Sequence, residues 1–199
     1  LKEAGVDYFE VSLSGHRAEL HDIVAGAAGA FEQTVEGIRN LAKHGADFMV
    51  NIPIVKRNYL VLDKITSLAH ELGAGRIQYN FSRPVLNGPD WNRTTLVRLA
   101  DVTPFVNKAV RLAKSFGMTT DTEAIPLCHL EDRDISEAKT DFSKFASEDL
   151  HRTTTTDSNR RQARPLGDEC FECSLKDSCP TTWAAYQELF GTFEFSAVK

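Results

Sequence analysis

Two hydrophobic patterns alternate along the first 126 residues of the chain. Runs rich in β-branched and aromatic residues predict strands at 6–13, 48–55 and 76–81, and the run at 118–125 is interpreted as a fourth strand. Between these runs, apolar residues recur at the spacing of one helix face. The pattern therefore predicts a regular succession of strands and helices.

The helical spacing predicts three amphipathic helices, at about 31–41, 62–72 and 105–116. A glycine follows each of them, as is typical of a helix C-terminus; the three are Gly45, Gly73 and Gly117. The segment 14–29 is predicted to be a loop.

This alternation is typical of an α/β fold with parallel strands. The strands are mostly apolar on both faces, as a sheet covered by helices requires. Active sites in such folds form at the C-terminal ends of the strands. We therefore expect functional residues in the loops that follow Leu13, Val55, Phe81 and Ile125.

The character of the chain changes after residue 126, so we divide it into a β/α domain, 1–126, and a C-terminal extension, 127–199. Residues 132–164 are strongly polar without a helical or strand period, and they are predicted to be irregular, with 153–161 as a solvated surface loop. A short amphipathic helix is predicted near the C-terminus. Its apolar residues are Trp183, Tyr186, Leu189 and Phe190.

Composition narrows the classes of function. The formal net charge is −5 and 42% of the residues are hydrophobic, as in an ordinary globular domain. The charge argues against a nucleic-acid or anionic-membrane partner, and no apolar run reaches the roughly 18 residues of a membrane span. Because no signal-peptide pattern is present, we expect a cytoplasmic protein. The run at 1–5 resembles the end of a helix, so we expect the chain to begin within a fold.

All four cysteines lie in the extension, at Cys128, Cys170, Cys173 and Cys179. A metal or iron–sulfur site needs converging thiolates, and a CxxC pair with a third cysteine nearby supplies three of them. Cys128 is the remaining candidate, with His129 as an alternative ligand. The spacing of the cysteines alone favours a structural zinc site and an iron–sulfur site equally. Two disulfides or a redox CxxC are less favoured, because disulfides are rare inside cells and redox motifs directly follow a strand.

Four polar residues in the predicted strands are candidates for binding a ligand. Ser12 lies near the end of its strand, and Asn51 interrupts an apolar strand, where a buried amide needs partners. Gln78 and Asn80 alternate along one strand and therefore share a face. Each has a structural alternative: a bond to the backbone, a polar network, or a position against the helices.

Several histidines and one arginine are further candidates. His16, Arg17 and His21 lie in the loop predicted after the first strand, where contact with a ligand and a structural role are equally favoured. His44 and His70 lie near helix ends, where a cation suits the helix dipole, and they are interpreted as structural.

Several runs follow one another in the order found in a known enzyme family. They are GVDYFEVSLSG (5–15), HDIVAG (21–26), AFEQTVEGIRNL (30–41), VNIPI (50–54) and IQYNF (77–81). In this order they resemble the fourth, fifth and sixth core strands and the His-Asp-x-x-x-Gly motif of radical S-adenosylmethionine (radical SAM) enzymes. The cysteine-rich segment 127–199 is similar to the SPASM/twitch-type extensions of several subfamilies.

The resemblance implies the C-terminal part of a partial (β/α)6 TIM-like barrel, from about the fourth strand onward. It also implies that Cys128, Cys170, Cys173 and Cys179 hold an auxiliary [4Fe–4S] cluster. The CxxxCxxC motif of the catalytic [4Fe–4S] cluster is absent, so this segment alone is expected to be inactive. Ala25 stands where relatives often carry arginine, which removes one partner for the carboxylate of S-adenosylmethionine (SAM).

The implied function is that of an oxidoreductase or modifying enzyme that cleaves SAM reductively to a 5′-deoxyadenosyl radical. The radical would abstract hydrogen from a peptide or small-molecule substrate, with electrons from a donor such as ferredoxin or flavodoxin. The resemblance implies that Ser12, Asn51, Gln78 and Asn80 contact SAM or line its cavity. One alternative is a non-catalytic scaffold of the same fold that binds iron–sulfur or zinc. Another is an unrelated β/α enzyme with structural zinc.

Overall fold

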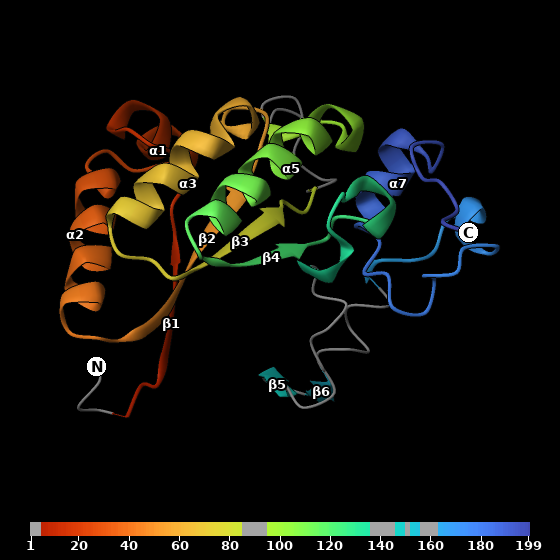
Figure 1. Ribbon diagram of the computed structural model, residues 1–199. Coiled ribbons are helices and arrows are strands. Elements are labelled where there is room, and N and C mark those ends of the chain that lie inside the picture. Colours follow the sequence, from red (N-terminus) through yellow and green to blue (C-terminus); the bar gives the residue numbers. More distant parts are fainter. Residues whose placement is uncertain (1–4, 85–94, 136–145, 150–151, 156–162) are drawn as a thin grey trace.

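A four-stranded parallel sheet in the order β1-β2-β3-β4 forms the centre of the structure (Figure 1). The strands are β1 (Tyr8–Ser12), β2 (Asp47–Ile54), β3 (Arg76–Phe81) and β4 (Thr119–Glu123). All four predicted strands are therefore confirmed. The structure is a computed structural model that describes residues 5–84, 95–135, 146–149, 152–155 and 163–199.

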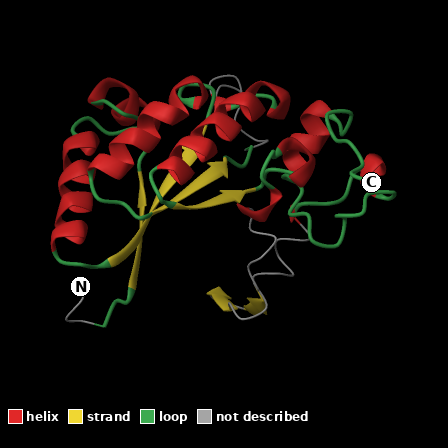
Figure 2. Ribbon diagram, viewed as in Figure 1, coloured by secondary structure: helices red, strands yellow, loops and turns green. Residues whose placement is uncertain are grey.

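The helices that alternate with these strands lie on one side of the sheet (Figures 1 and 2). They are α1 (Ala18–Ala25), α2 (Ala30–Lys43), α3 (Leu62–Glu71) and α5 (Leu99–Ser115). The prediction of a loop throughout 14–29 is wrong, because α1 lies inside it. Of its 8 residues only His21 is buried, so α1 has no apolar stripe to reveal it.

The covered face of the sheet is the hydrophobic core. Every second residue of β2 is buried, and Val50, Ile52 and Ile54 are almost inaccessible to solvent. Full burial of such a side chain contributes about 1.5–3 kcal/mol. Tyr79 of β3 is also buried, and its hydroxyl lies 2.8 Å from Thr66 Oγ1, so both buried hydroxyls have a partner.

The opposite face of the sheet is polar, which corrects the expectation that both faces are apolar. The strands alternate between core residues and polar residues, as in a sheet with one covered face. We call this surface the open face. Its polar residues are Glu10 and Ser12 on β1, Asp47 and Asn51 on β2, Arg76, Gln78 and Asn80 on β3, and Thr119, Asp121 and Glu123 on β4.

The C-terminal extension contains more regular structure than its sequence indicates. The antiparallel pair β5 (Ala146–Asp149) and β6 (Arg152–Thr155) lies within the segment predicted to be irregular, which corrects that prediction. These strands have 4 residues each, too short for a hydrophobic period. The rest of the predicted surface loop, 156–161, lies outside the described residues.

The predicted C-terminal helix is confirmed as α7 (Ala184–Phe190), and it is anchored to the sheet domain. Trp183 Nε1 donates a hydrogen bond to the Phe81 carbonyl at 2.6 Å, and the Tyr186 hydroxyl accepts one from the Leu99 N–H at 2.9 Å. In the described ranges no helix is long and apolar enough to cross a membrane. The strands form an open sheet here, so the partial (β/α)6 TIM-like barrel stays a prediction.

Candidate functional site

The four strand residues selected from the sequence all lie on the open face. Ser12, Asn51 and Gln78 stand in register on three adjacent strands, and Asn80 lies two positions further along β3. Adjacent parallel strands are about 4.8 Å apart, so these side chains form a row across the sheet. The alternative in which Gln78 and Asn80 face the helices is excluded, because the intervening Tyr79 occupies that face.

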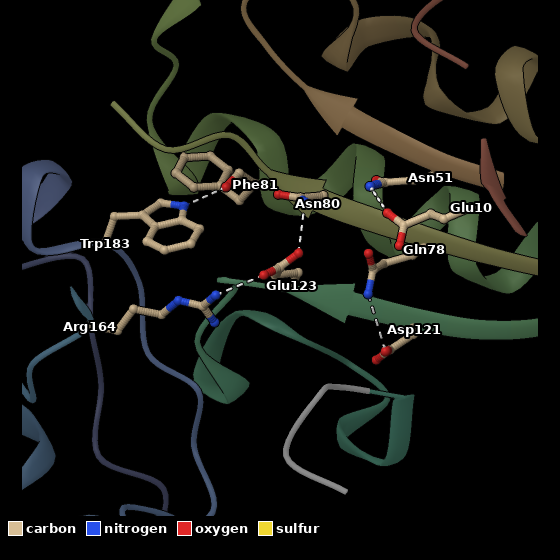
Figure 3. A network of polar contacts seen from close by, with 9 residues as sticks. All are labelled: Glu10, Asn51, Gln78, Asn80, Phe81, Asp121, Glu123, Arg164 and Trp183. Carbon is tan, nitrogen blue, oxygen red and sulfur yellow. Dashed lines mark hydrogen bonds and ion pairs between the residues drawn. The ribbon is translucent and has the colours of Figure 1, made fainter. Parts of the chain in front are cut away.

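Each amide in this row pairs with a carboxylate from an adjacent strand (Figure 3). In every pair the amide nitrogen donates and the carboxylate accepts, which fixes the orientation of both side chains. The pairs are Asn51 with Glu10 (2.5 Å), Asn80 with Glu123 (2.7 Å) and Gln78 with Asp121 (3.4 Å).

The oxygen of Asn51 is the exception in this network. Asn51 Oδ1 is buried and has no hydrogen-bond partner among the described residues. A buried acceptor without a donor costs about 1–3 kcal/mol. A ligand hydroxyl over the open face would remove that cost, whereas a purely structural network would leave it.

Arg164 connects the C-terminal extension to the open face (Figure 3). Its side chain is buried, Nη2 donates to Glu123 Oε1 at 2.8 Å, and the guanidinium lies 4.0 Å from the Trp183 ring centroid. Burial lowers the pKa of Arg164, and the charge of Glu123 opposes that shift. Sequence reasoning missed this residue, because Arg164 lies at the end of a polar segment without periodicity.

A cleft of about 550 Å³ lies where β1 and β2 end. This is the edge at which parallel α/β folds place their active sites. The cleft includes residues from three of the predicted loops: Ser14, Arg57 and Ser82. Hydroxyl groups and small apolar groups dominate its lining. Its polar lining residues are Ser12, Ser14, His21, Thr34, Arg57, Ser82 and Thr95.

His21 has a structural role beneath this cleft. Its Nδ1 accepts a hydrogen bond from the Ser14 N–H at 3.1 Å, and its Nε2 lies 3.4 Å from Thr34 Oγ1. Burial lowers the pKa of His21, which favours the neutral ring that these contacts require. Gly15 fits closely here, since an added Cβ would lie 2.5 Å from the His21 backbone nitrogen.

Asp22 also supports the local fold. Its two carboxylate oxygens accept hydrogen bonds from the N–H groups of Gly29 (2.7 Å) and Phe31 (2.8 Å) at the start of α2. Gly26 ends α1 in the left-handed conformation with φ 73°. His21, Asp22 and Gly26 of the HDIVAG run thus fix the local backbone that forms one wall of the cleft.

The other basic candidates, His16, Arg17 and His70, do not line the cleft. Arg17 is exposed and lies 3.8 Å from Glu19, a geometry that contributes little to stability. Burial lowers the pKa of His16. His70 stacks on Phe116, with ring centroids 4.3 Å apart, which agrees with a structural role.

Asn58 is a site-supporting residue that the sequence analysis missed. It is completely buried, and Nδ2 donates to the carbonyls of Ser14 (3.0 Å) and Pro53 (2.8 Å), while Oδ1 accepts from the Val55 N–H (2.9 Å). Asn58 thereby joins the loop after β1 to the end of β2. Its only sequence signal is a polar residue just after a buried strand.

The four cysteines are brought into one region of the extension. Cys128 lies in a 3-10 turn (Leu127–His129) and Cys170 in another (Asp168–Cys170). All four thiols are free and partly buried. The sulfurs are near enough that ionised neighbouring cysteines would raise the pKa of Cys170 and Cys179 further, after the larger effect of burial. As the side chains stand, the described residues contain no group of three or more ligands placed to hold a metal ion.

Two of the four sulfurs accept hydrogen bonds from the backbone. Backbone N–H groups point at two of them, from Leu127 to Cys179 Sγ and from Val198 to Cys173 Sγ, both at 3.4 Å. Such N–H donors tune cluster thiolates. Burial raises the pKa of Cys170 and Cys179, which favours their neutral thiol forms. His129 Nδ1 is engaged with Thr103 Oγ1 at 2.7 Å.

Three curated proteins are similar to parts of this chain. The AdoMet-dependent heme synthase of Methanosarcina barkeri is 40% identical over 90 residues, which are 45% of this chain and 26% of the relative. That of Oleidesulfovibrio alaskensis is 39% identical over 74 residues, 37% of this chain and 19% of the relative. The mycofactocin maturase MftC of Mycobacterium tuberculosis is 34% identical over 113 residues, 55% of this chain and 26% of the relative.

These relatives are radical SAM enzymes. The matches support the radical SAM superfamily. The chain matches only about a quarter or less of the length of these relatives. Radical SAM relatives imply SAM and a [4Fe–4S] cluster as cofactors. The parallel sheet is consistent with part of a radical SAM fold. No family model and no solved structure matches the chain.

Proposed function

We propose that the chain is the C-terminal part of a radical SAM enzyme that binds SAM between the open face and the cleft at the strand ends. One observation carries the proposal: the polar row of Ser12, Asn51 and Gln78 lies on the face that the helices leave uncovered, next to the cleft. The similarity to radical SAM enzymes supports it independently.

The residues of the row would bind and orient the cofactor. Asn51 Oδ1 would accept a hydrogen bond from a ribose hydroxyl, which supplies the donor that this buried oxygen lacks. Ser12 lines the cleft and would bind the ribose or the carboxylate of SAM. Gln78 and Asn80, held by Asp121 and Glu123, would line the cavity beside the cofactor. Such preorganised partners hold a ligand accurately.

When bound, SAM and the catalytic [4Fe–4S] cluster would supply a 5′-deoxyadenosyl radical for hydrogen abstraction. The substrate would be a peptide or a small molecule, and a ferredoxin or flavodoxin would supply electrons. In the proposal Cys128, Cys170, Cys173 and Cys179 hold an auxiliary [4Fe–4S] cluster. Ligation by four cysteines leaves no iron open to substrate, so this cluster would relay electrons or support the fold.

SAM cleavage by the full-length protein tests the proposal. The protein is purified and reconstituted without oxygen, reduced with dithionite, and the 5′-deoxyadenosine formed from SAM is quantified by chromatography. We expect product from the wild type and about tenfold less from Asn51→Ala, because a buried hydrogen bond to the ribose is lost.

Asn40→Ala is the matched control, since Asn40 is exposed on α2 away from the open face. It should cleave SAM at the wild-type rate. Wild-type protein that carries its clusters and is reduced, yet forms no 5′-deoxyadenosine, would refute the proposal and favour the non-catalytic scaffold.

A further inference from the structure

Charge is distributed unevenly between the open face and the cleft. The open face carries four carboxylates, those of Glu10, Asp47, Asp121 and Glu123, and two of them are paired with arginines, Asp47 with Arg76 and Glu123 with Arg164. Among the described residues that line the cleft there is no carboxylate, and the basic side chains are Arg57 and His21. The cleft therefore suits the anionic part of a ligand, and the neighbouring face does not.

Arg57 is the permanent charge of this cleft. His21 is buried, its Nδ1 accepts a backbone hydrogen bond, and it favours its neutral form. An arginine side chain stays protonated throughout the physiological pH range. Along the described parts of the chain, no carboxylate forms an ion pair with Arg57.

The backbone on both sides of Arg57 is fixed. The Lys56 N–H donates to the Thr95 carbonyl at 2.8 Å. On the other side, the buried Asn58 side chain holds Val55, Pro53 and Ser14. The backbone that carries Arg57 is therefore held in place, so a ligand that binds Arg57 need not order this turn as well.

The α1 side of the cleft contributes no charge. Ala25 ends α1 and lines the same cleft as Arg57, but it offers only a methyl group. The sequence leaves open which residue pairs with the carboxylate of SAM when Ala25 cannot. Arg57 is the described cleft residue with the required charge and with a planar fork of donors that matches a carboxylate.

We propose that Arg57 binds the carboxylate of the methionine moiety of SAM in this cleft, in the role that Ala25 cannot fill. The inference rests on the proposed function, because it assumes that SAM is the ligand. The inference gives Arg57, in the turn after β2, the role of binding SAM and fixing its position. This role is separate from the cysteines, because the described hydrogen bonds to cysteine sulfurs do not involve Arg57.

Binding of SAM and of decarboxylated SAM, which lacks only the carboxylate, separates this contact from a general effect on the fold. Affinities are measured by equilibrium dialysis with the anaerobically reconstituted full-length protein. We expect Arg57→Ala to weaken SAM binding about 10- to 100-fold, the usual effect of losing charge-assisted hydrogen bonds. Its affinity for decarboxylated SAM should equal that of the wild type. Arg57→Lys should give an intermediate loss, because it keeps the charge without the fork.

Lys56→Ala is the matched control, since it removes the adjacent cation, which lines a different surface depression. It should bind both ligands as the wild type does. The role of Arg57 would be refuted if Arg57→Ala bound SAM as tightly as the wild type. It would also be refuted if Arg57→Ala lost the same affinity for SAM and for decarboxylated SAM. Neither result would refute the proposed function. A wild-type protein that binds neither ligand would overturn the proposed function as well.

Discussion

Asn58 holds together two strand ends through one side chain. Asn58→Ala would leave the Val55 N–H and the carbonyls of Ser14 and Pro53 without their partners in a buried position. We expect the free energy of unfolding of the full-length protein to fall by about 2–4 kcal/mol. Urea unfolding followed by circular dichroism measures the change.

An exposed asparagine should contribute much less to the free energy of unfolding than the buried Asn58. Asn40 is exposed, so Asn40→Ala should change the stability by less than about 0.5 kcal/mol. If Asn58→Ala were as stable as Asn40→Ala, the three hydrogen bonds would not be what fixes the turn that carries Arg57.

At the scale of elements, Asp22 controls how α2 begins. The N–H groups of Phe31 and Gly29 hold the pKa of the Asp22 carboxyl below its ordinary value. Because the pKa is lower in the folded protein, ionised Asp22 stabilises the fold above the unfolded pKa, and this stabilisation is lost as the pH falls through the folded pKa.

Asp22→Asn should therefore be less stable than the wild type at pH 7, and the difference should shrink below about pH 4, where an ordinary aspartate protonates. Urea unfolding between pH 7 and pH 3 measures both proteins. Glu36→Gln, exposed on the same helix, serves as a control that should change stability little. A difference that stays constant down to pH 3 would contradict the role of ionised Asp22.

The elements also show what sequence patterns can predict. β2 and α5 were predictable because each contributes a long apolar stripe to the core, such as Val50, Ile52 and Ile54. The helix α1 was not, because it is short and His21 is its one buried residue. The strands β5 and β6 were not, because 4 residues each are too few to show a period.

The same distinction applies to the site. Strand alternation was enough to put Gln78 and Asn80 on one face. Arg164 and Asn58 could not be found that way, because their contacts join segments distant in sequence, such as Arg164 with Glu123. Contacts between distant segments leave no periodic pattern in the sequence, because the partners come together only in the folded protein.

At the scale of the whole molecule, two candidate sites are joined by a few specific contacts. Glu123 on the open face pairs with Arg164, and Trp183 binds both the Arg164 guanidinium and the Phe81 carbonyl. Figure 3 shows these contacts. The four free cysteines belong to the extension that the contacts attach to the sheet. Loss of one site therefore need not remove the other, which makes the metal content of each separately testable.

If the four cysteines hold the proposed auxiliary cluster, Cys179→Ala should remove that cluster and leave the catalytic one, whose ligands the proposal places outside this chain. In the reconstituted full-length protein we expect about half of the wild-type iron and sulfide, together with retained SAM binding. Ser178→Ala, which changes the exposed neighbouring residue, should keep all of the iron. Metal analysis for iron and zinc distinguishes an iron–sulfur site from a zinc site, the two kinds of site that the cysteine spacing favours equally. Wild-type protein with one zinc per chain, lost in Cys179→Ala while the iron content stays constant, would show that the four cysteines form a structural zinc site.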